Sequence, residues 1–351
     1  MKFGPVAIGE SLGCVAAHGA RAEGIVLKKG DAITPAHIAA LGQAGVATVV
    51  VAELEPGDVG ENEAARVLAE AVAGSGLWIE RAFTGRANIF ARHNGVLSVD
   101  VGAVDRINAV DERLTLATLP SLRAVEDGEM VGTVKIIPFA VEASRLGEAI
   151  AAASAVPGGP LRLHPYRARR IGVVSTILPG LKPSVIAKTL RVLDDRLAPS
   201  GSGIGAGLQV PHEATALAEA LRGLVQSHDM VIVYGASAIA DRRDVIPAAL
   251  VAAGGTVDHL GMPVDPGNLL MMGRLGNVPV LGAPGCARSP KENGFDWVLQ
   301  RLLADIPVTS ADIRRLGAGG LLMEIVSRPQ PRLGGSPSPP VAPLPVGQTV
   351  S

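Results

Sequence analysis

The sequence predicts an α/β protein whose second half is a three-layer domain, a parallel β-sheet with helices on both faces. A mixed N-terminal region and a small antiparallel β domain precede it. From Arg170 to about Val326, short apolar runs alternate with longer segments of helical periodicity, the pattern of a parallel sheet with crossover helices. Aromatic residues make up only 3% of the 351 residues and apolar residues 48%. The core must therefore be built from Ala, Val, Leu and Ile, which favours α/β layers over an aromatic-rich sandwich.

Residues 1–75 form the expected N-terminal region, which reads as helical from about residue 5, then briefly extended, then helical again. Thr34 and Pro35 mark the start of a helix that continues to Gly45, because threonine caps helix starts and proline fits the first turn. A buried strand over Val46–Val51 and an Ala-rich helix over Asn62–Ala73 follow.

Residues 76–160 form the predicted small antiparallel β domain, because the pattern changes to a period of two between about 76 and 140. The runs Ala87–Arg92 and Val96–Val101 flank His93-Asn94-Gly95, and Asn-Gly between two strands is a hairpin signal because both residues tolerate positive φ. We expect further strands at Leu114–Leu119 and Val131–Ile137, a helix over about 141–153 and a loop at 156–160.

Residues 168–328 form the predicted parallel-sheet domain. The expected strands are Ile171–Ser175, Met230–Val233, Val257–Leu260 and Val278–Leu281, and the expected helices are Ser184–Ala198, Glu213–Val225, Val245–Ala253 and Phe295–Leu303. Ligands of such sheets bind beyond the carboxyl ends of the strands, so the loops there are the candidate site. The Pro-rich residues 329–351 are expected to be a flexible tail or linker.

Charge, cysteine content and hydropathy exclude several classes of protein. The 32 basic and 33 acidic residues leave a net charge of −1, which argues against nucleic acid as a partner. Cys14 and Cys286 are too far apart in the sequence to suggest a metal-binding pair. Neither an export signal nor an apolar stretch of membrane-spanning length is evident. We expect a cytoplasmic protein without membrane contact.

Three stretches after strands are rich in groups that bind oxyanions. Ser175 and Thr176 lead into a loop that ends at Lys182 and Ser184, although Ser184 as an ordinary helix cap explains part of this. In Tyr234–Pro247, the small residues Gly235, Ala236 and Ser237 allow close backbone approach, and Asp241 and Asp244 can hold Mg²⁺ or simply favour a helix start. The third stretch has two parts, Asp265 and Asn268 beside a Pro-Gly turn, and the group Gly285, Cys286, Arg288, Ser289, Lys291 and Asn293. The alternative interpretation of these residues is an ordinary turn with a solvated basic rim.

Other conspicuous residues have simpler interpretations. No histidine lies near Cys286 in the sequence, so we interpret it as a packing residue rather than a nucleophile. His164, His212 and His259 are interpreted as structural or rim residues, because no two of them have metal-ligand spacing. The Gly203-Ile-Gly205 segment lacks a preceding apolar strand and is a weak dinucleotide fingerprint in a flexible stretch.

The segment 170–305 resembles the molybdopterin-binding domain of molybdopterin molybdotransferases and adenylyltransferases. The resemblance rests on RIGVVST (170–176), DMVIVYGASAIADRRDVIP (229–247), MPVDPGN (262–268) and GAPGCARSP (282–290). Residues 28–51 are similar to the region that precedes this domain in molybdotransferases. The whole arrangement is most similar to a bacterial subgroup in which a molybdenum-cofactor nucleotidyltransferase domain often follows.

The resemblance implies a homo-oligomeric protein of molybdenum cofactor biosynthesis that binds molybdopterin, either bare or nucleotide-activated. It implies Asp244 as the catalytic residue, a Mg²⁺ ion on Asp244 and Asp241, and molybdate as co-substrate. The implied pterin-binding residues are Ser175, Thr176, Gly235, Ala236, Ser237, Asp265, Pro266, Gly267, Asn268, Pro284, Gly285, Cys286, Ser289 and Lys291.

The sequence also departs from the family pattern. Ala236 replaces the second glycine of a Gly-Gly pair, Thr176 leads into Ile-Leu-Pro instead of Gly-Asp-Glu, and Cys286 replaces an asparagine. These changes leave two functions open, an enzyme that inserts molybdate and a non-catalytic module that presents the pterin to a nucleotidyltransferase domain or partner. An unrelated α/β nucleotide-binding protein is the third alternative.

Overall fold

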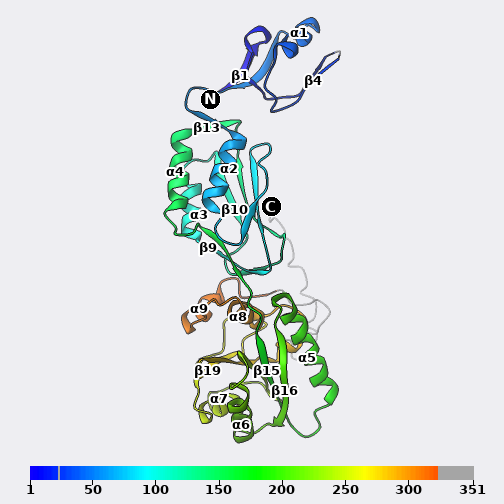
Figure 1. The fold of residues 1–351 in the computed structure, drawn as a ribbon, viewed down its shortest axis with the longest axis vertical. Helices are drawn as coiled ribbons and strands as arrows, with labels where there is room; N and C mark the ends of the chain where they lie inside the picture. Colours follow the sequence, from blue (N-terminus) through cyan, green and yellow to red (C-terminus); the bar gives the residue numbers. More distant parts are fainter. Residues whose placement is uncertain (23, 323–351) are drawn as a thin grey trace, which may run out of the picture.

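The computed structural model describes residues 1–22 and 24–322, which form three lobes stacked along the long axis of the molecule (Figure 1). The tail predicted at 329–351 lies outside the described residues. Separate hydrophobic clusters lie in the first and second lobes, and two clusters lie in the third. Among the described residues, no helix has the length and apolar character needed to span a bilayer.

The first lobe is a three-stranded antiparallel sheet of β1 (Lys2–Ala7), β5 (Thr48–Glu53) and β2 (Val15–Ala16), with β3 (Ala20–Ala22), β4 (Ile25–Leu27), the short helix η1 (Ile8–Glu10) and α1 (Pro35–Gln43) packed around it. Thr34 caps α1 as predicted, because its hydroxyl accepts a hydrogen bond from the His37 N–H at 3.3 Å. The helical reading of the first residues is wrong. They pair along their whole length with β5, and this long-range pairing outweighs the local pattern.

The second lobe holds two antiparallel sheets. One contains β7 (Leu77–Ile79), β8 (Arg86–Ala91), β10 (Leu114–Thr118) and β12 (Met130–Ile136), and the other contains β9 (Gly95–Val99), β11 (Arg123–Val125) and β14 (Leu161–Pro165). The pair β6 (Asp58–Gly60) and β13 (Ala140–Glu142) and the helices α2 (Glu61–Val72), α3 (Val101–Asn108) and α4 (Ala143–Ser154) complete the lobe. Leu68 and Val72 of α2 belong to the hydrophobic core of this lobe.

The hairpin predicted across His93-Asn94-Gly95 is wrong. β8 pairs with β12 and β7, whereas β9 pairs with β11 and β14 in the other sheet. Neither Asn94 nor Gly95 has the positive φ of a tight hairpin turn. Asn94 instead bridges two parts of the molecule: its Oδ1 accepts from the Asp127 N–H, and its Nδ2 donates to the Pro199 carbonyl of the third lobe at 2.9 Å.

The third lobe is built on a six-stranded sheet in the order β16-β15-β17-β20-β19-β18. The strands are β15 (Arg170–Ile177), β16 (Gly203–Pro211), β17 (Met230–Tyr234), β18 (Thr256–Leu260), β19 (Met271–Leu275) and β20 (Val278–Ala283). β15 is parallel to β16 and β17, and β17 is parallel to β20, but β19 runs antiparallel to both of its neighbours. The sheet is therefore mixed, and the prediction of a purely parallel sheet is corrected.

Two strands of this sheet were not predicted from the sequence, and the first is the antiparallel strand β19. It joins β20 through Gly276 and Asn277, with Leu275 opposite Val278 and Gly276 at φ 59°. A glycine at the first central position is typical of tight two-residue hairpin turns. The second oversight is β16, because the glycine-rich stretch at 203–207 was interpreted as flexible. It forms an edge strand, and a Cβ on Gly205 would lie 2.4 Å from the Arg170 side chain.

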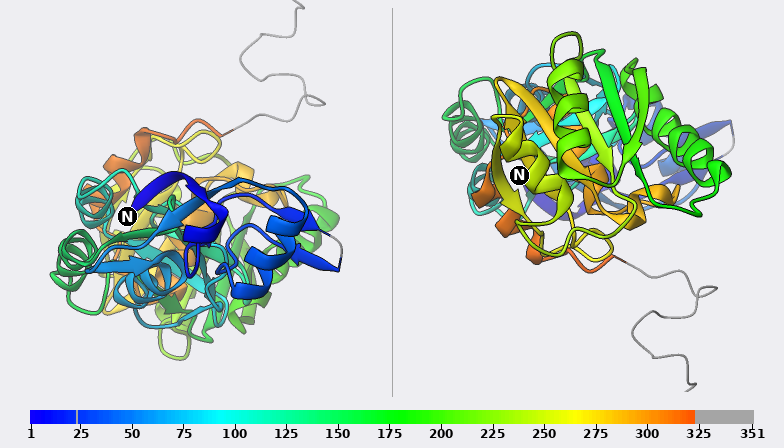
Figure 2. Two further views of the ribbon diagram at one scale, coloured as in Figure 1. Left: turned by 90° about the horizontal axis from the view of Figure 1, so that it is seen from above. Right: turned by 90° about the horizontal axis from the view of Figure 1, so that it is seen from below.

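Helices cover both faces of this sheet, as the view from below in Figure 2 shows. Alternate residues of one strand point to opposite faces, so Ile232 packs with α5 (Pro183–Leu197) and α8 (Gly294–Leu303), and Val233 packs with α6 (Ala214–Leu224) and α7 (Val245–Ala252). Four short helices complete the lobe: η2 (Ala198–Ser200), η3 (Gly285–Arg288), α9 (Ser310–Arg314) and η4 (Arg315–Gly317).

Candidate functional site

The carboxyl ends of β15, β17 and β20 meet at one edge of the third-lobe sheet. Ser175 lies opposite Tyr234, and Tyr234 lies opposite Ala283. Parallel pairing therefore brings the three loops after these strands to one place, as the sequence predicts. β16 ends at the same edge, where Ile177 lies opposite Pro211, so His212 joins the group.

A hydrogen-bond chain at this edge links Thr176, His212 and Ser237. The hydroxyl of buried Thr176 lies 2.8 Å from His212 Nδ1 and accepts the backbone N–H of Ala236 at 2.9 Å. The other ring nitrogen, Nε2, lies 3.0 Å from the hydroxyl of exposed Ser237. A buried anchor thus orients an imidazole, and the imidazole orients a surface hydroxyl.

His212 is the residue of this site that sequence reasoning missed. The sequence predicts only a structural or rim residue there, because no second histidine lies at metal-ligand spacing. Its position directly after β16, on the strand next to β15, is the signal that would have placed it beside Thr176.

Arg288 fixes the loop that follows β17. The Arg288 side chain donates to the Gly235 carbonyl at 2.8 Å and to Thr189 Oγ1 at 2.9 Å, and its guanidinium lies over the Tyr234 ring. A Cβ on Gly235 would lie 2.6 Å from the Ser237 carbonyl oxygen, so only glycine fits this turn. Arg288, proposed from the sequence among the anion-binding groups, instead fixes the loop that carries Ala236 and Ser237.

The two aspartates predicted to hold Mg²⁺ bind their own loop. Asp244 Oδ2 accepts the backbone N–H of Ala240 at 2.7 Å and that of Asp241 at 3.3 Å. Asp241 Oδ1 accepts from Arg243, whose guanidinium holds the pKa of the Asp241 carboxyl below its usual value. No group of three or more His, Cys, Asp or Glu side chains suited to a metal occurs within residues 1–22 and 24–322. Asp241 and Asp244 therefore do not form a metal site together with other described side chains.

The loop after β20 is tied down by a buried ion pair. Arg196 of α5 pairs through Nε with Asp296 Oδ1, and both side chains are about nine-tenths buried. The Arg196 guanidinium also donates to the carbonyls of Ala287 and Ser289, at 2.8 and 2.6 Å. Asp296 Oδ2 accepts the Asn293 N–H at 2.8 Å, which closes the capping box of α8. One carboxylate therefore fixes both the loop and the helix that follows it.

The residues predicted to bind a ligand in this loop differ in exposure. Pro284 is buried, Gly285 and Lys291 are exposed, and Ser289 is half-buried. Cys286 is half-buried, and burial raises the pKa of its thiol. A thiol kept protonated in this way supports its interpretation as a packing residue.

The loop containing Asp265, Pro266, Gly267 and Asn268 packs elsewhere. The Pro266 carbonyl accepts from the Gly294 N–H, and Asp265 exchanges backbone hydrogen bonds with Gly320 and Leu322. A Cβ on Gly267, at φ 144°, would lie 2.8 Å from the Gly294 nitrogen. These contacts join the loop to the start of α8 and the 317–322 segment rather than to residues 235–237.

Three helices begin at the site edge without a side-chain cap. The residues before α5, α6 and α7 are Lys182, Glu213 and Asp244, and none of them accepts a capping hydrogen bond from its own helix. α8 and α9 do have capping boxes. Uncapped helix starts leave N–H groups and the positive end of the helix dipole available to an anion. The predicted Ser184 cap is not found.

We expect Arg196→Met to destabilise the protein by about 3–5 kcal/mol, because it leaves the buried Asp296 carboxylate and two loop carbonyls without their hydrogen-bond donor. Urea unfolding measures this loss. Arg222→Met, which removes an exposed arginine that donates to Ala252, is the control and should cost less than about 1 kcal/mol. A loss of similar size in both variants would contradict the role of the ion pair.

Cys286 should react slowly with iodoacetamide at about pH 7.5, because its raised pKa leaves little thiolate. The rate should still be climbing at a pH where an ordinary thiol is already largely ionised. Mass spectrometry of the Cys286 peptide, in native and in guanidinium-unfolded protein, measures both rates. A native rate that is fast and already constant near neutral pH would indicate an activated thiolate and would refute the packing interpretation.

Comparisons with known proteins give only remote similarities. No family model and no curated protein matches the chain. A molybdopterin biosynthesis MoeA protein from Pyrococcus horikoshii is 17% identical with a TM-score of 0.31, covering 87% of this chain and 75% of its own. A CinA protein of unknown function from Thermoplasma acidophilum is 16% identical with a TM-score of 0.31, over 40% of this chain and 99% of its own. A molybdenum cofactor biosynthesis protein from Pyrococcus furiosus is 12% identical with a TM-score of 0.25, covering 87% and 64%.

Proposed function

We propose that the third lobe binds molybdopterin, bare or nucleotide-activated, and that the protein acts in molybdenum cofactor biosynthesis. The observation that carries this proposal is the meeting of Thr176, the loop 235–237 and the start of η3 at one edge of the sheet. These are three of the four segments whose residues resemble the molybdopterin-binding family.

The chemistry of this edge suits a polar, anionic ligand. Ser237 presents an exposed hydroxyl that His212 orients at 3.0 Å, and Lys182, also exposed, contributes a cation just before α5. The uncapped starts of α5, α6 and α7 add N–H donors for phosphate oxygens. In this proposal Thr176 and Arg288 do not touch the ligand but position the loops that do.

A more specific proposal is that the protein inserts molybdate into the pterin, with Asp244 as the catalytic residue. One oxygen of Asp244 already accepts two backbone N–H groups, and Asp241 is engaged with Arg243. These contacts favour the second candidate function, a non-catalytic module that presents the pterin to a nucleotidyltransferase domain or partner. We therefore assign no step to a metal ion.

Calorimetric titration of the protein with molybdopterin and its adenylylated form tests binding. We expect Ser237→Ala to weaken binding about tenfold, because one hydrogen bond to an anionic group is lost. Ser310→Ala is the matched control, since Ser310 lies 2.7 Å from His259 Nδ1 in a similar serine–histidine pair outside the site. Equal weakening in both variants, or no binding by the unmodified protein, would contradict the proposal.

Asp244→Asn separates the two candidate functions, because asparagine keeps an oxygen for the backbone N–H groups but removes the charge. Binding should persist in this variant. If the unmodified protein releases nucleotide from adenylylated molybdopterin when molybdate is added and the variant does not, the protein is an inserting enzyme. If neither releases nucleotide, the protein is a binding module.

A further inference from the structure

A cavity lined by both polar and apolar residues lies between the second and third lobes, away from the site described above. Its volume is about 680 Å³, and it is lined by the 120–124 segment around the start of β11, by α8 and by the 315–319 segment around η4. Leu303 of α8 accepts the Arg167 N–H just before β15 begins. The cavity is thus near the amino end of β15, whereas the proposed pterin site is at its carboxyl end.

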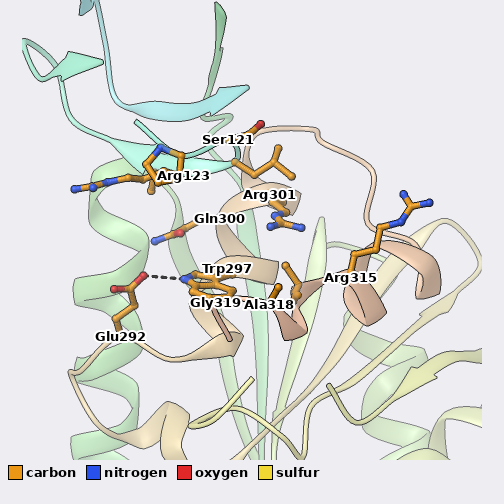
Figure 3. A pocket seen from close by; sticks show the side chains of 13 residues that line it. Ser121, Arg123, Glu292, Trp297, Gln300, Arg301, Arg315, Ala318 and Gly319 are labelled. Atoms are coloured by element: carbon orange, nitrogen blue, oxygen red, sulfur yellow. Dashed lines mark hydrogen bonds between the residues drawn. The ribbon is translucent and has the colours of Figure 1, made fainter. Parts of the chain in front are cut away.

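Arg301 is the unusual residue of this cavity. Its side chain lines the cavity and is directed into it in Figure 3, yet the residue is only 6% exposed. Its Nε is buried without a hydrogen-bond partner, and no described residue forms an ion pair with its guanidinium. Burial lowers the pKa of this guanidinium. The Asp312 carboxylate acts on this guanidinium electrostatically but forms no ion pair with it. A buried cation without a direct partner is costly, and an anion in the cavity would reduce that cost.

The other charges around the cavity are mostly positive. Arg315 of η4 is exposed and, within the described part of the chain, has no ion pair, and Arg123 of β11 has only a long contact of 3.5 Å with Glu129. Glu292 is the single acidic side chain of the lining, and its Oε1 accepts the Trp297 indole N–H at 2.8 Å. Three guanidinium groups against one carboxylate suit a ligand that carries at least two negative charges.

Guanidinium groups bind phosphate oxygens through their charge and through paired hydrogen bonds. Gln300 and Ser121 add neutral hydrogen-bonding groups to the lining, and Trp297 contributes an aromatic ring (Figure 3). We propose that this cavity between the lobes binds the phosphoryl groups of a small polyphosphate, free or nucleotide-borne, with Arg301 as the central contact. The ligand would bridge the two lobes, because Arg123 belongs to the second lobe and Arg301 to the third.

Thermal unfolding and calorimetric titration of the full chain test this site, with inorganic phosphate, pyrophosphate and ADP at constant ionic strength. We expect pyrophosphate to raise the Tm by several degrees and Arg301→Met to weaken its binding at least tenfold. Tighter binding of ADP than of pyrophosphate would identify a nucleotide-borne phosphate, and the reverse order would identify a free one.

Three control measurements separate ligand binding from folding. Arg301→Met should be at least as stable as the unmodified protein without ligand, since it removes a buried unpaired charge. Arg315→Gln changes an exposed residue and should weaken pyrophosphate binding severalfold without affecting the fold, whereas Arg21→Gln in the first lobe should bind normally. No binding by the unmodified protein, or equal binding by all variants, would overturn the proposal. Neither result would affect the pterin site, which these variants leave intact.

Discussion

Parallel pairing of β15 with β16 and β17, and of β17 with β20, is the constraint on which the candidate site depends. This pairing brings the loops after β15, β16, β17 and β20 to one edge of the sheet, although these loops are far apart in the sequence. Because helices start where these loops end, the same constraint brings the positive ends of α5, α6 and α7 to that edge. The site is therefore a consequence of topology, and its side chains refine it.

Two arginines make this edge rigid. The Arg196 guanidinium binds Asp296 and loop carbonyls. The Arg288 guanidinium binds Thr189 and the Gly235 carbonyl. Basic residues near a predicted anion site are usually interpreted as ligands, but these two are structural. The groups left to meet a ligand are Ser237, Lys182 and backbone N–H groups, a set suited to binding and orientation.

Much of the third lobe could be predicted from its sequence because strands and helices of strong periodicity alternate there. The predictions that were wrong involve tertiary context. Gly273 and Arg274 interrupt the apolar run of β19, and β16 is rich in glycine, so neither has the periodicity of a strand. Without β16 the neighbours of His212 could not be recognised. Asn94-Gly95 resembles a hairpin turn, but Asn94 bonds to Asp127 and Pro199, contacts that local sequence does not encode. Arg301 gave no signal at all, because its exceptional property is the absence of a partner in the described structure.

Hydrogen–deuterium exchange of the protein with and without molybdopterin tests the central claim most directly, because it locates the ligand without a substitution. The proposed site predicts slower exchange in the segments 176–183, 235–241 and 284–289, with residues 120–124 unchanged. Protection confined to other segments, or no protection at saturating pterin, would contradict the assignment of the ligand to the carboxyl edge of the sheet.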